Sequence, residues 1–195
     1  PGMPGFDADL HPYPYDAAAA RAELSASRFG GPAGLPSITL DLPGEGGGAQ
    51  LPEAVADQLS ATLGISVTVE QTPWATYQAE LDAGGYDMFM LGWAADYADP
   101  QDFLDVLFHG RSPMNHSMYA DAEVDAWLEA ARVERDEDAR LALYGQAERR
   151  ILDDAVWIPL YTAVATWLVA PYVREFTLPP VVVPRMARVW LAEVE

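Results

Sequence analysis

Four aspartates recur at every third position in one short segment: Asp96, Asp99, Asp102 and Asp105. We call them the aspartate series. Paired carboxylates can serve as the acid and base of glycoside hydrolysis, and clustered ones can bind Ca²⁺. The alternating acids and Gly of an EF-hand loop are absent. Acids also stabilise helix N-termini. We therefore interpret Asp99 as the N-cap of a helix that has Pro100 at its first position. Asp102 would then be an acid in the first turn, and Asp105 a solvated position on the same helix. A glycoside hydrolase that uses a pair of these acids is kept as a minor alternative.

Asp96 differs from the other three because it precedes this helix. It follows an apolar run, residues 86–93, that is typical of a strand buried on both faces. Ligands of open α/β sheets bind at the carboxyl ends of strands. Trp93 ends the run, and an aromatic ring beside a carboxylate can hold an ammonium group. From the residues alone, this interpretation and a purely structural one, with Trp93 in the core and Asp96 as a loop cap, have equal support.

Charge and composition narrow the classes of partner. The chain has 195 residues, 30 acidic against 11 basic side chains, and a net charge of -19. Nucleic-acid binding needs clustered Lys and Arg, so we expect no nucleic-acid partner. Residues 29–110 contain no Lys or Arg, which suits a cationic or neutral ligand group.

No motif in the sequence supports catalysis or a metal site. His109 and His116 lack a third ligand nearby, cysteine is absent, and G-x-S-x-G, Walker A and H-E-x-x-H are all missing. We therefore predict no catalytic residue, no metal, no cofactor and no enzyme activity. Trp74 follows Pro73 at the start of a predicted helix, where its ring could line a cleft.

The elements that must position these residues follow an α/β order: strand, helix, strand, helix, strand, then helices, then further strands. Predicted helices are 16–27, 50–63, 74–81, one from 99, 121–134 and 136–152. Predicted strands are 37–42, 66–71, 86–93, 157–161, 165–169 and 181–183. This order predicts one α/β domain with a partly parallel sheet.

Residues 93–100 (WAADYADP), followed by Phe103-Leu104, resemble the W-x-x-D-Y-x-D-P-x-x-F-L segment of family 5 extracellular solute-binding proteins. These are the dipeptide-, oligopeptide- and nickel-binding receptors of bacterial ABC importers. Further segments agree with the family in order along the chain. They are Pro4-Gly5-Phe6, Tyr13-Pro14-Tyr15-Asp16, Gly85-Tyr86-Asp87, Asn115, Val124-Asp125, Arg140, Leu143-Tyr144, Ala147-Glu148 and Ile158-Pro159-Leu160-Tyr161.

The resemblance implies a fold and a domain. The expected fold is α/β, a single lobe of the periplasmic-binding-protein-like (type II) class, with a mixed, mostly parallel sheet flanked by helices. Residues 1–195 would form the C-terminal ligand-binding lobe of a bilobal protein. The ends, 1–12 and about 180–195, would be segments that cross between the lobes, and the N-terminal lobe of the same protein would be a partner.

The resemblance also implies a ligand site. In peptide-binding members the acid at the position of Asp96 pairs with the α-ammonium of the peptide, and the tryptophan at Trp93 lines the same pocket. Tyr97 belongs to the same motif, and Asn115 matches a recurrent family position. Trp74, proposed from its place at the start of a predicted helix and not from the resemblance, completes the predicted ligand-binding residues. Some members have an Arg shortly before the tryptophan for the ligand carboxylate. Here that stretch is residues 88–91, Met-Phe-Met-Leu, so such a partner would come from the other lobe.

The function expected from the resemblance is capture of extracellular peptides and their delivery to the membrane permease subunits of an ABC importer. A receptor of the same class for another solute, such as an oligosaccharide, an opine or a metal chelate, is the alternative. The expected location is the periplasm or the outer face of the cell envelope. Anchoring by lipid through a preceding segment is left open.

Overall fold

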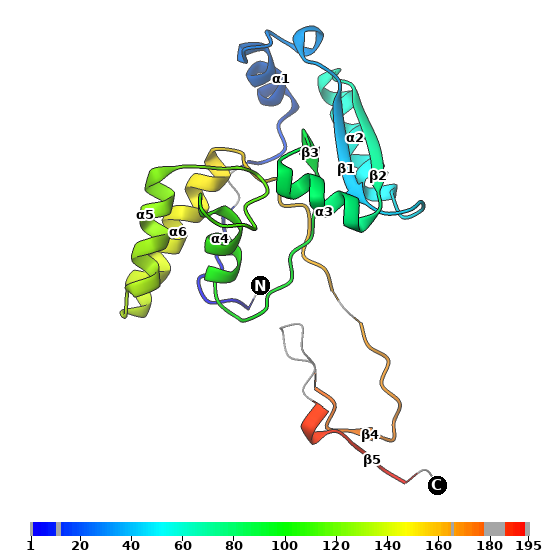
Figure 1. Cartoon of the computed structure of the whole chain (residues 1–195), viewed down its shortest axis with the longest axis vertical. Helices are drawn as coiled ribbons and strands as arrows, with labels where there is room; N and C mark the ends of the chain where they lie inside the picture. Colours follow the sequence, from blue (N-terminus) through cyan, green and yellow to red (C-terminus); the bar gives the residue numbers. More distant parts are fainter. Residues whose placement is uncertain (1, 11–12, 165, 178–185, 194–195) are drawn as a thin grey trace. The chain divides into compact units, whose positions relative to one another are not determined.

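The computed structural model describes residues 2–10, 13–164, 166–177 and 186–193. The chain folds as two compact units (Figure 1). The sheet unit comprises residues 10–92 with 116–118, and the helical unit comprises 1–9, 93–115 and 119–195. Among the described residues, every helix is too short or too polar to span a lipid bilayer.

The sheet unit is built on three parallel strands in the order β2-β1-β3. They are β1 (Ile38–Pro43), β2 (Val67–Thr72) and β3 (Met88–Phe89). Leu40 of the central strand pairs in register with residues of both neighbours and is 2% exposed. The predicted α/β class with a parallel sheet is thus confirmed. The predicted long buried strand 86–93 is wrong, because only two of its residues form β3 and both are half-buried.

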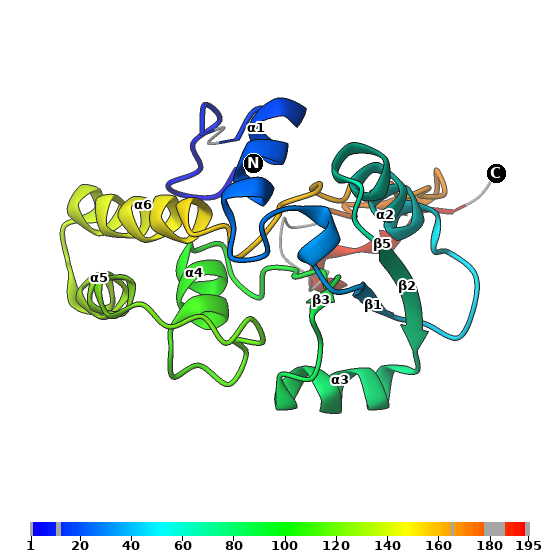
Figure 2. The same cartoon turned by 90° about the horizontal axis from the view of Figure 1, so that it is seen from above.

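Helices flank this sheet. They are α1 (Ala17–Ala26), a 3₁₀ turn η1 (Pro32–Gly34), α2 (Gln50–Leu63) and α3 (Trp74–Ala83). Figure 2 shows α2 and α3 on opposite sides of the strands. Gly64 ends α2 and Gly84 ends α3, both at positive φ (71° and 66°), which glycine adopts without a steric penalty.

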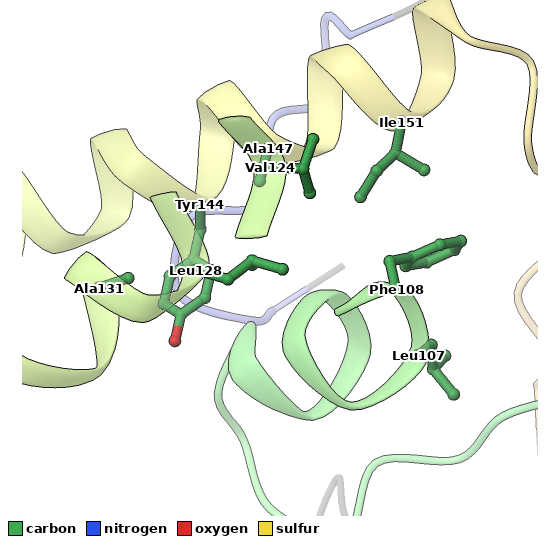
Figure 3. Close-up of a cluster of buried hydrophobic side chains, with 8 residues drawn as sticks. All are labelled: Leu107, Phe108, Val124, Leu128, Ala131, Tyr144, Ala147 and Ile151. Atoms are coloured by element: carbon green, nitrogen blue, oxygen red, sulfur yellow. The ribbon is translucent and has the colours of Figure 1, made fainter. Parts of the chain in front are cut away.

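The helical unit packs α4 (Gln101–Phe108) against α5 (Ala122–Val133) and α6 (Glu137–Asp153). Asp121 caps α5 by accepting the amides of residues 123 and 124, and Asp136 caps α6 by accepting that of residue 139. One apolar cluster joins the three helices (Figure 3). It comprises Leu107, Phe108, Val124, Leu128, Ala131, Tyr144, Ala147 and Ile151.

The C-terminal part departs from the prediction. Residues 157–164 and 166–169 contain no strand, so the strands predicted at 157–161 and 165–169 are wrong over these residues. Their side chains are largely exposed, up to 103% for Leu168. A strand needs a neighbour to pair its backbone groups, and no strand in the described part of the chain pairs with this segment. In this part of the chain the described strands are instead β4 (Val173–Arg174) and β5 (Trp190–Leu191), which pair antiparallel. The 3₁₀ turn η2 (Met186–Arg188) precedes β5. The predicted strand 181–183 lies outside the described residues.

Candidate functional site

The segment Trp93–Pro100, which we call the Trp93 loop, leads into α4 without regular secondary structure. Asp96 lies at its centre and is exposed. Among the residues that the structure describes, its carboxylate has no hydrogen-bond or ion-pair partner. A solvated carboxylate in that state is available to a cation.

Asp102 binds two residues of the Trp93 loop through its side chain. Its Oδ2 accepts the indole N–H of Trp93 at 3.1 Å and the backbone N–H of Asp96 at 3.0 Å. Asp102 itself is 2% exposed. It lies in the first turn of α4 as predicted, but its carboxylate turns back to the loop and makes no side-chain cap of the helix.

Asp99 fixes the loop to α6. Its Oδ1 accepts the backbone N–H of Gln101 at 2.9 Å and Nη2 of Arg140 at 2.6 Å. Burial acts to raise the pKa of Asp99, but the hydrogen bonds from Arg140 and the Gln101 amide outweigh it, so the pKa is lowered. The helix begins at Gln101 with Pro100 as its N-cap, so the predicted N-cap at Asp99 is one residue too early.

Asp105 is not the solvated residue that was predicted. It is 5% exposed, and Arg132 of α5 forms two hydrogen bonds with its carboxylate, both at 2.7 Å. This pairing across 27 residues allows a charge to be buried, because the guanidinium fork matches the carboxylate. Three members of the aspartate series therefore bind protein groups through their side chains, and Asp96 does not.

Tyr97 lies beside Asp96 in the same loop. Tyr97 is 42% exposed, and its hydroxyl donates to Oε1 of Gln101 at 3.3 Å. Burial raises the pKa of Tyr97, and the surrounding acids, Asp102 first among them, raise it further. The phenol therefore stays protonated over a wide pH range and can donate a hydrogen bond.

The other two predicted site residues lie elsewhere. Asn115 is 6% exposed, and its Nδ2 donates to the backbone carbonyls of His109 at 3.3 Å and Tyr119 at 2.8 Å, which holds together the connection between α4 and α5. Trp74 is the first residue of α3 in the sheet unit and is 56% exposed, with its ring 6.2 Å from that of Tyr77. The structure thus brings Trp93, Asp96 and Tyr97 together in one loop.

A cavity of about 380 Å³ in the helical unit is lined by neither Trp93 nor Asp96. It is lined by Gln101, Asp105, Val106, His109, Arg111, Ser112 and Arg132. The charges at this cavity are already paired, since Arg132 binds Asp105 and Arg111 binds Glu129. It therefore offers no better ligand site than the exposed Trp93 loop.

Sequence reasoning missed the residues that position the loop. Asp102 was recognised only as a helix-end acid, and Arg132 and Arg140 were given no site role. The available signal was the presence of four arginines, Arg132, Arg140, Arg149 and Arg150, on the predicted helices 121–134 and 136–152, close in sequence to an acidic segment. That signal does not say which acid pairs with which arginine.

The sequence profile described as "Bacterial extracellular solute-binding proteins, family 5 Middle" matches residues 1–115, more than half of the chain. The chain belongs to this family. Its members are solute-binding proteins, in agreement with the prediction that the chain is not an enzyme. The glycoside hydrolase alternative has no remaining support, since Asp99 and Asp102 are also both bound to protein groups.

Individual family 5 relatives are similar over most of this chain. Di/tripeptide-binding protein 2 of Pseudomonas aeruginosa is 30% identical over 172 residues, which cover 82% of this chain and 31% of the relative. The murein tripeptide binding protein MppA of Escherichia coli is 26% identical with a TM-score of 0.78, over 90% of this chain and 35% of that one. The chain therefore spans about a third of the length of these two relatives.

A third relative was solved with a ligand. It is described as the ABC transporter-associated periplasmic binding protein DppA from Helicobacter pylori in complex with peptide STSA. It is 30% identical with a TM-score of 0.70, over 82% of this chain and 31% of that one. These structures confirm the predicted periplasmic-binding-protein fold, and the relative's description places it in the periplasm.

Proposed function

We propose that the protein containing this chain is the peptide-binding component of an ABC importer, and that Asp96 pairs with the α-ammonium of the peptide. The observation that carries the proposal is the state of Asp96. It is the one member of the aspartate series whose side chain has no hydrogen-bond or ion-pair partner among the described residues, and it is exposed. The peptide-binding relatives supply the ligand class.

The physical argument concerns the ligand's charge. An ammonium that leaves water must find a fixed partner, or the loss of its hydration opposes binding. A carboxylate supplies both charge and hydrogen-bond acceptors. Trp93 lies three residues before Asp96, is held through its indole N–H and packs against the core cluster while staying only partly buried. The part of its ring that stays accessible would pack against the ligand or meet the cation.

The architecture proposed for the whole protein follows from the length of its relatives, of which this chain spans about a third. Ligand pockets bury most of a small ligand's surface, whereas Asp96 is exposed here. We propose that residues 1–195 form the C-terminal ligand-binding lobe, that a second lobe of the same protein closes over the Trp93 loop, and that 1–12 and about 180–195 cross between the lobes. Trp74 and Asn115 remain proposed ligand-binding residues in this scheme, as does Tyr97.

The partners and location follow from the same reasoning. The proposed receptor delivers its peptide to ABC permease subunits in the membrane, and it acts in the periplasm or at the outer face of the cell envelope. The periplasmic, ABC transporter-associated relative supports this assignment. Attachment by lipid stays an open part of the proposal.

Calorimetric titration of the natural full-length protein tests the ligand class. The probes are a tripeptide with free termini, a maltotriose-type oligosaccharide and a nickel chelate. We expect saturable binding of the tripeptide and no binding of the other two, with no change in any probe after prolonged incubation. Binding of the sugar or the chelate in place of peptide would refute peptide as the ligand class.

A further inference from the structure

Asp102 is a buried carboxylate with two donors on one oxygen. The indole N–H of Trp93 and the backbone N–H of Asp96 both point to Oδ2, at 3.1 and 3.0 Å. Both donors lie in the Trp93 loop, and the acceptor lies in α4, a helix packed into the core of the helical unit. The hydrogen bonds therefore tie the loop to a rigid element.

We propose that Asp102 is the positioning residue of the ammonium site: its Oδ2 sets the place of the Trp93 ring and of the backbone that carries Asp96. The inference rests on the proposed function for its ligand. Asp102 is 2% exposed in this chain, so its role is to orient the residues that meet the ligand. Trp93 and Asp96 are then placed by one atom, and their relative position is fixed.

The chemistry of the donors explains why a carboxylate suits this place. An indole nitrogen can only donate, and a backbone N–H that is partly shielded from water needs an acceptor as well. A charged acceptor makes stronger and shorter bonds than a neutral one. Asp102 also lies in the first turn of α4, where a negative charge interacts favourably with the helix dipole. The same carboxylate can therefore accept from two loop donors while it stabilises the start of α4.

The alternative is that Asp102 serves only the stability of α4, and a matched residue separates the two roles. Asp105 lies three residues further along the same helix and is a similarly buried carboxyl group, but its partners are Arg132 and Gln101 and not the Trp93 loop. Asp105→Ala should lower the melting temperature without changing the geometry of the loop. Asp102→Ala should change the loop.

The first measurement is the ¹⁵N–¹H resonance of the Trp93 indole in the natural full-length protein labelled with ¹⁵N-tryptophan, assigned with Trp93→Phe. In Asp102→Ala we expect the indole proton to move upfield and to exchange with solvent at least about tenfold faster. In Asp105→Ala it should stay in place. If Asp102→Ala does not fold, Asp102→Asn should show a smaller shift in the same direction. An unchanged indole resonance in the folded variant overturns the proposal.

The second measurement is the dissociation constant of a tripeptide and of its N-acetylated form. Asp102→Ala should weaken the free tripeptide about tenfold or more, and the acetylated one much less, whereas Asp105→Ala should affect both equally or neither. Equal losses for both ligands in Asp102→Ala would show a merely structural role and overturn the proposal. If the wild type binds no peptide, the proposed function fails, and the indole resonance still decides whether Asp102 holds Trp93.

Discussion

Arg140 of α6 places its Nη2 2.6 Å from Oδ1 of Asp99, three residues beyond Asp96. The guanidinium also lies over the ring of Tyr144, 5.0 Å from its centroid. Since Tyr144 is part of the core cluster, this ion pair connects the exposed loop to the centre of the helical unit. A site built on a loop gains its precision from such connections.

Loss of the ion pair should reduce stability in a pH-dependent way. The pKa of Asp99 is lowered in the folded protein, so its contribution is present above the ordinary aspartate pKa and is lost as the pH falls through the lowered value. We expect Asp99→Asn to lower the free energy of unfolding by about 1–2 kcal/mol at pH 7. Urea denaturation between pH 3 and 7 should show the difference shrinking on the acid side. A difference that is constant over this range would contradict the assignment.

Asp41 should show the opposite pH dependence. It lies in the central strand β1 and is 6% exposed, and its pKa is raised by burial and then by the charges of Glu70 and Asp87. The contribution of its protonated form to the free energy of unfolding is fully present below the ordinary aspartate pKa. This contribution is lost as the pH rises through the raised pKa. Asp41→Asn should therefore raise the melting temperature at pH 7, by roughly 2–4 °C.

The exposed neighbour Glu70 is the matched control for Asp41. Glu70→Gln removes one repelling charge but leaves the buried carboxylate, so we expect a smaller gain by differential scanning calorimetry. At pH 3 neither substitution should stabilise. A lower melting temperature for Asp41→Asn at neutral pH would show that its carboxylate makes a favourable interaction.

Arg132 should matter more for stability than its partial exposure indicates. Its side chain is 40% exposed, but the carboxylate that it binds, Asp105, is 5% exposed. Arg132→Met leaves that charge buried and unpaired, which should cost about 2–3 kcal/mol in urea denaturation. The double substitution Arg132→Met with Asp105→Leu should recover part of the loss. The free energies of unfolding of the wild type, the two single variants and the double variant form a cycle. If the losses of Arg132→Met and Asp105→Leu simply add in the double variant, the two residues are not coupled.

Local signals in the sequence predicted the helix ends well. Asp16, Asp121 and Asp136 each accept backbone amides at the start of a helix, and Gly64 ends α2 where the left-handed conformation is needed. These features depend on residues a few positions apart, so the sequence contains the whole signal. The family motif in the same way indicated the loop that contains Asp96.

Features that depend on distant partners could not be predicted. Residues 157–164 have the composition of strands but form none, since strand formation depends on a neighbour that composition does not reveal. The burial of Asp105 depends on Arg132, 27 residues away. The two hydrogen bonds that Asp102 accepts, from Trp93 and from the backbone of Asp96, depend on the path that the Trp93 loop takes beside α4. Spacing along the chain does not determine any of these.

The most direct test of the central claim combines the substitution Asp96→Asn with N-acetylation of the peptide in one calorimetric cycle on the natural full-length protein. If Asp96 pairs with the ammonium, Asp96→Asn weakens the free tripeptide by about ten- to several-hundredfold and leaves the melting temperature almost unchanged. The N-acetylated tripeptide binds weakly to the wild type and is hardly affected by the substitution. If Asp96→Asn binds the free tripeptide as tightly as the wild type, or mainly lowers the melting temperature, Asp96 is a structural residue and the ammonium site is wrongly assigned.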